Sequence, residues 1–328
     1  MKISQIPAAL DTALSAELSV LLKSGPGTAK TASVRQFAAK KKMKLIHIHA
    51  PLVDLLDLKG VISTQGDEAK FLPFNTWPKA SDDPVVILID ELPQCVPAIQ
   101  NAFSQLLIDK KMGDITLPKG SLVVATGNRR EDKAATHNIP SHVISRVMHI
   151  EVDRSNDDFF EWGMKNGVSA EVIAFGHWKP DAIYNFDPKN SQEPYGCYRT
   201  WEYVSNILKS KPPTELLGEM IAGVVGKGIS AEFMAYRRLF SQLPDPQQIL
   251  TNPHATTIPT DPGTLYAIST SIAHYVTKDN ADNFFSFISR LPTEYAVMCV
   301  KMTKAVLPTL PKTKAFSIWA NANSHIIL

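Results

Sequence analysis

Short apolar runs alternate with helix-like segments through the first half of the chain. The runs have the length and composition of buried strands, and they cover residues 19–23, 45–48, 85–89, 122–126 and 147–152. Apolar residues recur at helical spacing in two segments, residues 31–42 and 96–110. The run at 85–89, Val-Val-Ile-Leu-Ile, is apolar on both faces, as in a central parallel strand. This alternation predicts an α/β fold, a parallel sheet covered by helices on both sides.

The pattern changes after Asp153, where helical periodicity replaces the strand-like runs. The predicted helices cover residues 158–165, 170–175, 199–209, 213–225 and 231–242. A stretch rich in proline and threonine, residues 243–262, is predicted to be a loop that leads to a terminal helical group. We therefore expect two domains: a three-layer αβα core over residues 1–152, and an all-helical lid with a C-terminal helical extension over residues 153–328.

Composition limits the classes of partner and compartment. The chain has 328 residues, 44% of them hydrophobic, and a net charge of +2, which is too close to neutral to favour nucleic acid or an anionic membrane. Its three cysteines, Cys95, Cys197 and Cys299, are far apart and form no CxxC pair, so we expect neither a disulfide framework nor a zinc site. No apolar run is long enough to cross a bilayer, and the N-terminus lacks the pattern of a signal peptide. A reducing cytoplasm fits best.

Residues 24–31, Ser-Gly-Pro-Gly-Thr-Ala-Lys-Thr, follow the first predicted strand and open the first long helix. A phosphate-binding loop needs this context, because backbone N–H groups and the helix N-terminus converge on the phosphates. Lys30 would reach the terminal phosphates, and the Thr31 hydroxyl would ligate magnesium. The usual pattern is GxxxxGK[ST], and Ser24 and Ala29 replace its two glycines. Ala29 could crowd the phosphates, or lie in the first helical turn at a negative φ. The alternative is a plain Gly/Pro turn.

Asp90 and Glu91 end the buried run at 85–89. Ligands of open parallel sheets lie at the carboxyl ends of the strands, where two adjacent carboxylates favour a cation. Asp90 suits a magnesium ligand, and Glu91 suits the general base that activates water. The alternative is a solvated turn.

Three further residues fit such a site. Asn128 follows the run at 122–126 and could orient the attacking water, or simply occupy a turn. Arg146 precedes the last strand and could stabilise phosphoryl charge across a subunit boundary, or form a surface ion pair; Arg129 and Arg130 are its rivals. Arg199 begins a helix of the second domain and could contact the γ-phosphate, or cap that helix.

Taken in this order, these features resemble the AAA+ ATPases, and more narrowly the MoxR family with its phage and prophage members. The closer match is carried by segments 57–60 (DLKG), 90–94 (DELPQ), 99–114, 115–120 (ITLPKG), 127–129 (GNR), 136–140 (THNIP) and 198–202 (YRTWE). The resemblance covers most of the chain and weakens after about residue 240.

The resemblance implies a role for each residue. The nucleotide-binding (Walker A) loop would comprise Gly25, Pro26, Gly27, Thr28, Ala29, Lys30 and Thr31. Asp90 and Glu91 would form Walker B, with Asn128 as sensor 1, Arg146 as arginine finger and Arg199 as sensor 2. Residues 51–77 would hold an insert, and residues 112–121 a hairpin.

The same resemblance implies ATP and Mg²⁺ as ligands, and ATP hydrolysis that drives chaperone-like remodelling of a protein client. The assembly would be a homo-oligomeric ring, usually a hexamer, often with a partner that contains a von Willebrand A domain.

Two further features do not change the predicted function. His47 and His49 lie two apart on a predicted strand, and without a third ligand they favour core or surface histidines over a metal site. The lysines at 40, 41, 42 and 44 suit a helix C-terminus. Two alternatives remain: a nucleotide-dependent scaffold or switch that does not hydrolyse ATP, motivated by Ser24 and Ala29, and a DNA-associated motor, supported only by the lysines.

Overall fold

The computed structural model of the protein describes residues 1–65, 68–132, 137–189 and 192–324. The chain forms two compact units. Unit 1 consists of Met1–Ser155 with Asp187–Lys189, and unit 2 consists of Asn156–Phe186 with Asn190–Leu328. Among the described residues, no helix has the length and apolar character needed to cross a lipid bilayer.

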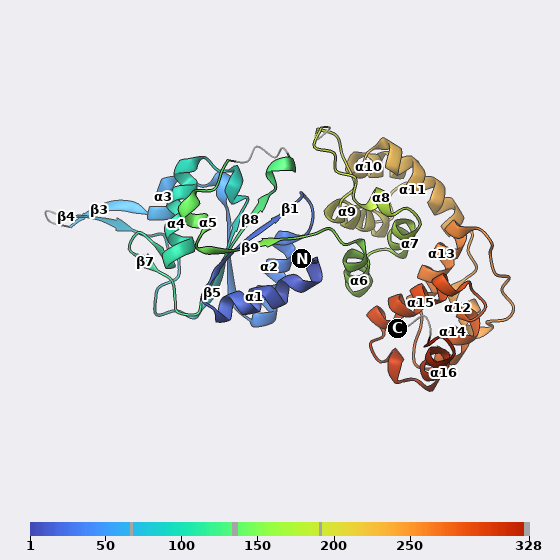
Figure 1. Ribbon diagram of the computed structural model, residues 1–328. Helices are drawn as coiled ribbons and strands as arrows, with labels where there is room; N and C mark the ends of the chain where they lie inside the picture. The colour runs from blue at the N-terminus through green and yellow to red at the C-terminus, as the bar shows by residue number, and fades with distance from the viewer. Residues whose placement is uncertain (66–67, 133–136, 190–191, 325–328) are drawn as a thin grey trace. The chain divides into compact units, whose positions relative to one another are not determined.

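A five-stranded sheet forms the centre of unit 1 (Figure 1). Its strands stand in the order β2-β5-β8-β1-β9, and every neighbouring pair is parallel. In that order they are β2 (Lys44–His49), β5 (Val85–Asp90), β8 (Leu122–Asn128), β1 (Ser19–Ser24) and β9 (Val147–Glu151). Each apolar run predicted to be a strand is one, and the predicted parallel sheet is confirmed.

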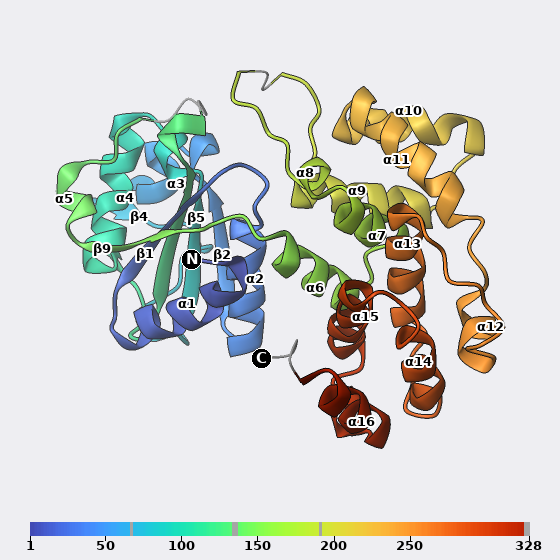
Figure 2. The same ribbon diagram turned by 45° about the vertical axis from the view of Figure 1, so that its right-hand side comes forward.

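Helices cover both faces of this sheet (Figure 2). One face carries α1 (Ile6–Ser15) and α2 (Lys30–Lys41), whose apolar side chains pack on Val86, Leu88 and their neighbours. The other carries α4 (Pro97–Asp109), which packs on Ile87 and Ile89. Successive residues of β5 therefore point to opposite cores, which explains why its sequence is continuously apolar.

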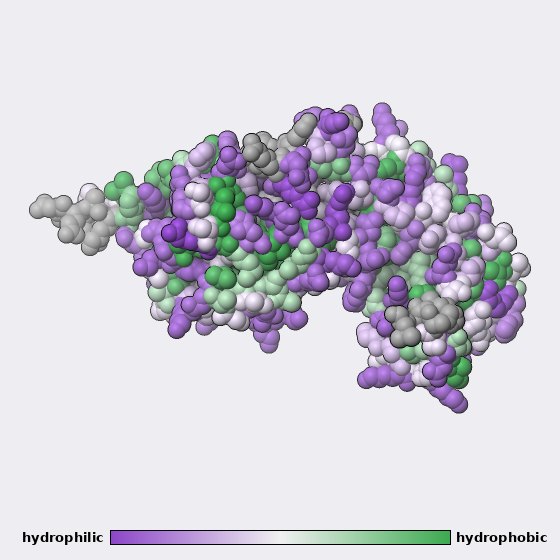
Figure 3. Space-filling view, viewed as in Figure 1, coloured by the Kyte–Doolittle hydropathy of each residue, from purple (hydrophilic) through white to green (hydrophobic). Residues whose placement is uncertain are grey.

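Short elements complete unit 1. Between β2 and β5 lie η2 (Ala50–Leu52), α3 (Leu55–Lys59) and the antiparallel hairpin of β3 (Val61–Gln65) and β4 (Glu68–Leu72). A second hairpin, β6 (Lys111–Met112) and β7 (Ile115–Thr116), precedes β8. The remaining short elements are η1 (Ile3–Gln5), η3 (Leu92–Gln94), η4 (Arg130–Asp132) and α5 (Ser141–Ile144). The β3–β4 hairpin leaves apolar side chains on the surface, among them Val61, Ile62 and Leu72 (Figure 3).

The described part of unit 2 is helical. Its elements are α6 (Asn156–Asn166), α7 (Ala170–Trp178), α8 (Pro180–Ile183), α9 (Tyr198–Lys209), α10 (Thr214–Val225), α11 (Lys227–Phe240), α12 (Pro246–Thr251), α13 (Pro262–Ala273), α14 (Ala281–Ile288), α15 (Thr293–Val306), η5 (Leu310–Lys312) and α16 (Lys314–Ala322). The predicted all-helical region is confirmed. The loop predicted over residues 243–262 is wrong in part, because α12 lies within it, with Asp245 accepting a hydrogen bond from the Gln247 N–H.

Candidate nucleotide-binding site

The loop between β1 and α2 folds around its own polar side chains. The Thr28 hydroxyl is buried, donates to the Gly25 carbonyl at 3.0 Å and also contacts the Ser24 hydroxyl. Ser24, which replaces the first glycine of the usual pattern, is fully buried at the end of β1. Its hydroxyl oxygen accepts a hydrogen bond from the Lys30 ammonium at 2.8 Å. Ser24 is thus part of the internal hydrogen bonding of the loop.

Ala29 occupies a backbone conformation that favours glycine. Its φ is 63° and its ψ 19°, in the left-handed region, and Gly27 also has a positive φ of 70°. The sequence-based alternative that placed Ala29 in the first helical turn at a negative φ is therefore wrong. The residue is the N-cap of α2, and the turn requires this dihedral whichever residue occupies it. The usual pattern has glycine here for that reason.

The Lys30 ammonium lies against the loop and the end of β8. Its side chain is largely buried, and its Nζ donates to the Ser24 carbonyl at 3.3 Å and the Gly25 carbonyl at 3.0 Å. Its Nζ is also 3.2 Å from the Asn128 Oδ1, which accepts a hydrogen bond from it. Strand β1 pairs with β8 in a register that places Ser24 beside Asn128. This pairing brings the two predicted site residues Lys30 and Asn128 together.

Asp90, at the end of β5, accepts hydrogen bonds from three other elements. The Thr31 hydroxyl of α2 lies 3.1 Å from Oδ1 and 2.9 Å from Oδ2. The Thr126 hydroxyl of β8 donates to Oδ1, and the His47 Nε2 of β2 is 3.2 Å from Oδ2. Burial raises the pKa of Asp90, but the hydrogen bonds from Thr126, Thr31 and His47 outweigh it and leave the pKa below its usual value. The carboxylate is therefore held in its charged form.

Glu91 follows Asp90 at a sharp turn of the backbone, where its φ is 62°. Its N–H donates to the Thr126 hydroxyl at 3.2 Å, and its side chain is 40% exposed. The Glu91 Oε2 lies 3.5 Å from the His49 Nε2. A carboxylate on this turn is accessible to a water molecule at the edge of the sheet.

These side chains suit a magnesium–triphosphate ligand. Mg²⁺ binds oxygen donors, and Thr31 and Asp90 supply a hydroxyl and a carboxylate at one point. The Thr31 hydroxyl donates its hydrogen bond to Asp90, so its oxygen lone pairs are available to a cation. Lys30 and the N-terminus of α2 supply positive charge for phosphates. The donor set therefore fits the predicted Mg²⁺ and ATP.

The predicted arginine finger lies at the other end of the sheet. Arg146 directly precedes β9, whose first residue, Val147, pairs with Ser19 at the start of β1. It is exposed, and its Nη1 donates to the His142 carbonyl at 2.9 Å. The phosphate loop begins after Ser24, five residues further along β1, which corresponds to about 16 Å of strand. An arginine side chain does not span that distance, so Arg146 does not reach the phosphate loop of its own chain.

Arg129 and Arg130, the alternatives to Arg146, and Arg199, the predicted sensor 2, lie in other parts of the chain than Arg146. Arg129 donates to the Val152 carbonyl at 3.1 Å, which ties the end of β8 to the end of β9. Arg130 begins η4. Arg199 is exposed in the first turn of α9, in unit 2, and its role as sensor 2 stays a prediction.

Two sets of contacts were missed from the sequence. The sequence favours core or surface positions for His47 and His49 and does not indicate that their Nε2 atoms lie close to Asp90 and Glu91, as they do in the structure. The alternation His-Ile-His at the carboxyl end of the strand next to the acidic pair was the available signal. Thr126 belongs to a predicted strand, and the strand pattern does not indicate that it contacts both acidic residues.

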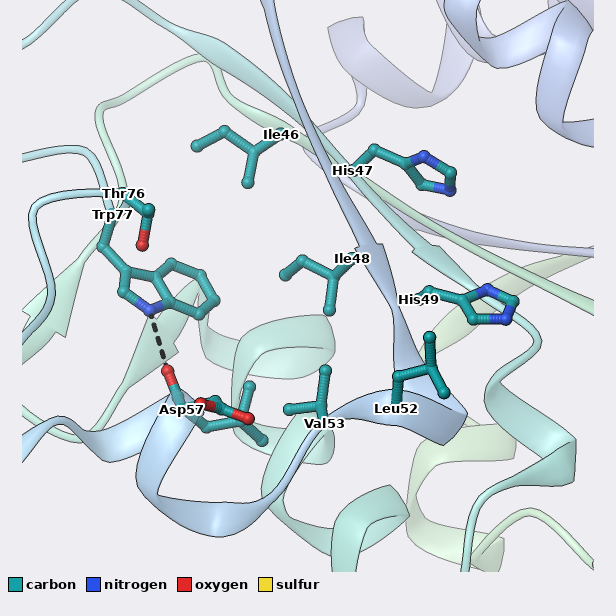
Figure 4. Close-up of a pocket in the computed structure, with 10 residues that line it drawn as sticks. Ile46, His47, Ile48, His49, Leu52, Val53, Asp57, Thr76 and Trp77 are labelled. Carbon is teal, nitrogen blue, oxygen red and sulfur yellow. Dashed lines mark hydrogen bonds between the residues drawn. The ribbon is translucent and has the colours of Figure 1, made fainter.

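The outer edge of β2 borders a cavity of about 370 Å³. Figure 4 shows the side chains of Ile46 and Ile48 on the side of Trp77, and those of His47 and His49 on the opposite side of the strand. The two histidines therefore lie on the face of the sheet that carries Asp90 of β5.

Several solved structures have a similar arrangement of elements. They include RuvB of Thermotoga maritima, described as a Holliday junction branch migration motor, with 16% identity over 82% of this chain and 80% of that chain, at a TM-score of 0.39. A putative ATPase from Cytophaga hutchinsonii has 19% identity over 90% and 78%, at 0.37. NtrX from Brucella abortus, in complex with ADP, has 14% identity over 94% and 67%, at 0.38. No protein-family model and no curated protein matches the sequence.

Proposed function

We propose that this chain binds ATP and Mg²⁺ on the loop between β1 and α2 and hydrolyses the ATP. One observation carries the proposal: the loop and the acidic end of β5 are joined directly, because Thr31 donates to Asp90 at 2.9 Å while the adjacent Lys30 donates to Asn128. A turn that merely linked a strand to a helix would not need a buried lysine, a charged carboxylate and an amide at one edge of the sheet.

Each side chain then has a task. Gly25, Gly27, Thr28 and Ala29 offer backbone N–H groups to the phosphates, and Lys30 offers its charge. Thr31 and Asp90 hold Mg²⁺, which when bound neutralises phosphate charge. Glu91 accepts a proton from the attacking water, and Asn128 orients that water.

The oligomeric part of the proposal depends on Arg146. Because this arginine is about 16 Å of strand away from its own phosphate loop, it can serve a nucleotide only on a neighbouring copy. A homo-oligomer that brings Arg146 of one copy to the phosphates of the next satisfies this condition. The resemblance noted in the sequence favours a closed ring of the MoxR type, with Arg199 as sensor 2 and a protein client.

Replacing Glu91 with glutamine tests the catalytic part. Glu91→Gln keeps the size of the side chain but removes the base, so we expect steady phosphate release to fall by about 10²–10⁴-fold. ATP binding, measured by calorimetry, should stay within a few-fold of wild type. Glu131→Gln is a matched control, since Glu131 is an exposed acid of the same unit that contacts only Arg129 among the ion pairs of the described residues. Turnover by Glu91→Gln at the wild-type rate would show that Glu91 is not the base.

Mixing two inactive variants tests the oligomeric part. Subunits carrying Glu91→Gln keep Arg146, and subunits carrying Arg146→Ala keep Glu91. In a mixed assembly some interfaces combine both wild-type residues, so we expect phosphate release to reappear on mixing. A mixture as inactive as its components, from variants that assemble, would contradict a role for Arg146 between subunits.

A further inference from the structure

β2 presents its two histidines toward the acidic end of β5. Their side chains lie on the opposite side of the strand from those of Ile46 and Ile48 (Figure 4). His47 Nε2 lies 3.2 Å from Asp90 Oδ2. The His47 side chain is 28% exposed, and the Asp90 side chain only 14%. The histidine therefore covers one oxygen of the carboxylate on its solvent side.

The direction of the His47–Asp90 hydrogen bond follows from a third residue. Arg35 Nη2 lies 3.0 Å from His47 Nδ1. A guanidinium group has hydrogen-bond donors and no acceptor, so Nδ1 must accept. The ring hydrogen is then on Nε2, which donates to Asp90. Arg35 thus fixes the tautomer in which His47 serves the carboxylate.

Two residues of helix α2 act on the Asp90 carboxylate, one directly and one through His47. Thr31 and Arg35 are four residues apart in α2 and share one face of it. Thr31 contacts the carboxylate directly, and Arg35 acts through His47. On the other side, Thr126 holds Oδ1 from β8. Without His47, both remaining donors would lie toward the phosphate loop and β8, and the carboxylate could rotate.

We propose that His47, with its ring held by Arg35, is a positioning residue that fixes the orientation of the Asp90 carboxylate for Mg²⁺ binding. This inference depends on the proposed nucleotide site and adds a residue on β2 to it. Partners that orient a metal ligand typically change metal affinity or activity by about 10–100-fold when they are removed. In this role His47 acts through Asp90 and supplies no ligand of its own.

The test measures how strongly Mg²⁺ improves nucleotide binding, which does not require turnover. The full chain is titrated with a non-hydrolysable ATP analogue by calorimetry, once in excess Mg²⁺ and once in EDTA. The ratio of the two affinities reports the contribution of Mg²⁺. For His47→Ala we expect this ratio to fall by about tenfold or more, while the affinity in EDTA stays at the wild-type value.

Two further variants separate positioning from packing. His47→Gln keeps an N–H donor at a similar reach, so it should restore most of the Mg²⁺ effect. His149→Ala is the matched control, because His149 lies on β9, the other edge strand, and its Nε2 is 2.9 Å from the Ile144 carbonyl. It should leave the ratio unchanged. Nitrogen NMR of the imidazole rings should find His47 with its hydrogen on Nε2, and Arg35→Ala should weaken that preference.

The outcomes distinguish this inference from the proposed function. A wild-type ratio in His47→Ala, or an equal loss in His47→Ala and His47→Gln, would overturn the positioning role while leaving the nucleotide site intact. A wild-type chain that binds no nucleotide with or without Mg²⁺ would overturn the proposed function and this inference with it. A selective loss in His47→Ala, reversed by His47→Gln, supports both.

Discussion

Replacing Ala29 with glycine should stabilise the protein, whereas most alanine-to-glycine changes destabilise. Ala29 has a φ of 63°, and an L-residue in this left-handed region costs roughly 1–2 kcal/mol. Glycine avoids that strain but loses more backbone entropy on folding, which costs about 0.5–1 kcal/mol. The balance predicts that Ala29→Gly raises the free energy of unfolding of unit 1 by about 0.5–1 kcal/mol.

A matched substitution in the same helix should have the opposite sign. Ala39 is exposed near the end of α2, within the right-handed helix. Ala39→Gly should therefore cost about 0.8–1 kcal/mol, the usual penalty for glycine in a helix. Both variants change one alanine to glycine, so their effects on the unfolded chain are alike. The difference between them isolates the backbone conformation at residue 29.

Urea unfolding followed by circular dichroism, with calorimetry as a second measurement, can resolve the difference. For a unit of this size, 1 kcal/mol corresponds to a melting shift of roughly 2–4 °C. Ala29→Gly should melt higher than wild type and Ala39→Gly lower. If Ala29→Gly destabilised the protein as much as Ala39→Gly, the backbone at residue 29 would not be in the left-handed region, and the account of this loop would be wrong.

Two further predictions concern buried polar groups. Thr126→Val removes a hydroxyl that contacts both Asp90 and the Glu91 N–H, so urea unfolding should show that the free energy of unfolding falls by about 1–3 kcal/mol. The control is Thr270→Val, at a buried hydroxyl with no hydrogen-bond partner among the described residues. This change should be neutral or stabilising. Burial lowers the pKa of His177 from 6.5 to about 4. The unfolded chain therefore binds the proton more readily, and stability should fall by about 2–3 kcal/mol between pH 6.5 and pH 4. His177→Phe should flatten that part of the curve, and an unchanged pH dependence would contradict the assignment.

The order of elements was predictable because each core strand has a distinctive pattern. Val-Val-Ile-Leu-Ile in β5 is apolar at every position, since it packs against helices on both faces. The acidic pair and Asn128 were predicted to be site residues because they follow such strands. Local pattern is enough here, because the carboxyl ends of parallel strands lie at one edge of the sheet.

Features that depend on contacts between strands were not predictable in the same way. His47 meets Asp90 because β2 pairs with β5 in a register that places His49 beside Asp90, and neither the pairing nor the register is visible in either segment alone. The positive φ of Ala29 was missed for a different reason. An alanine in a sequence does not indicate a left-handed turn, because non-glycine residues rarely have a positive φ. Only the position of Ala29 at the second glycine of the GxxxxGK[ST] pattern pointed to one.

The strand order explains why one strand joins the two halves of the site. β8 lies between β1, which leads into the phosphate loop, and β5, which ends in the acidic pair. Thr126 and Asn128 are two residues apart and so share one face of β8. Thr126 donates to Asp90 on one neighbour, and Asn128 accepts from Lys30 on the other side. A change that shifted β8 by one residue would turn both side chains to the opposite face. Such a shift would therefore remove the contacts of β8 with Lys30 and with Asp90 together.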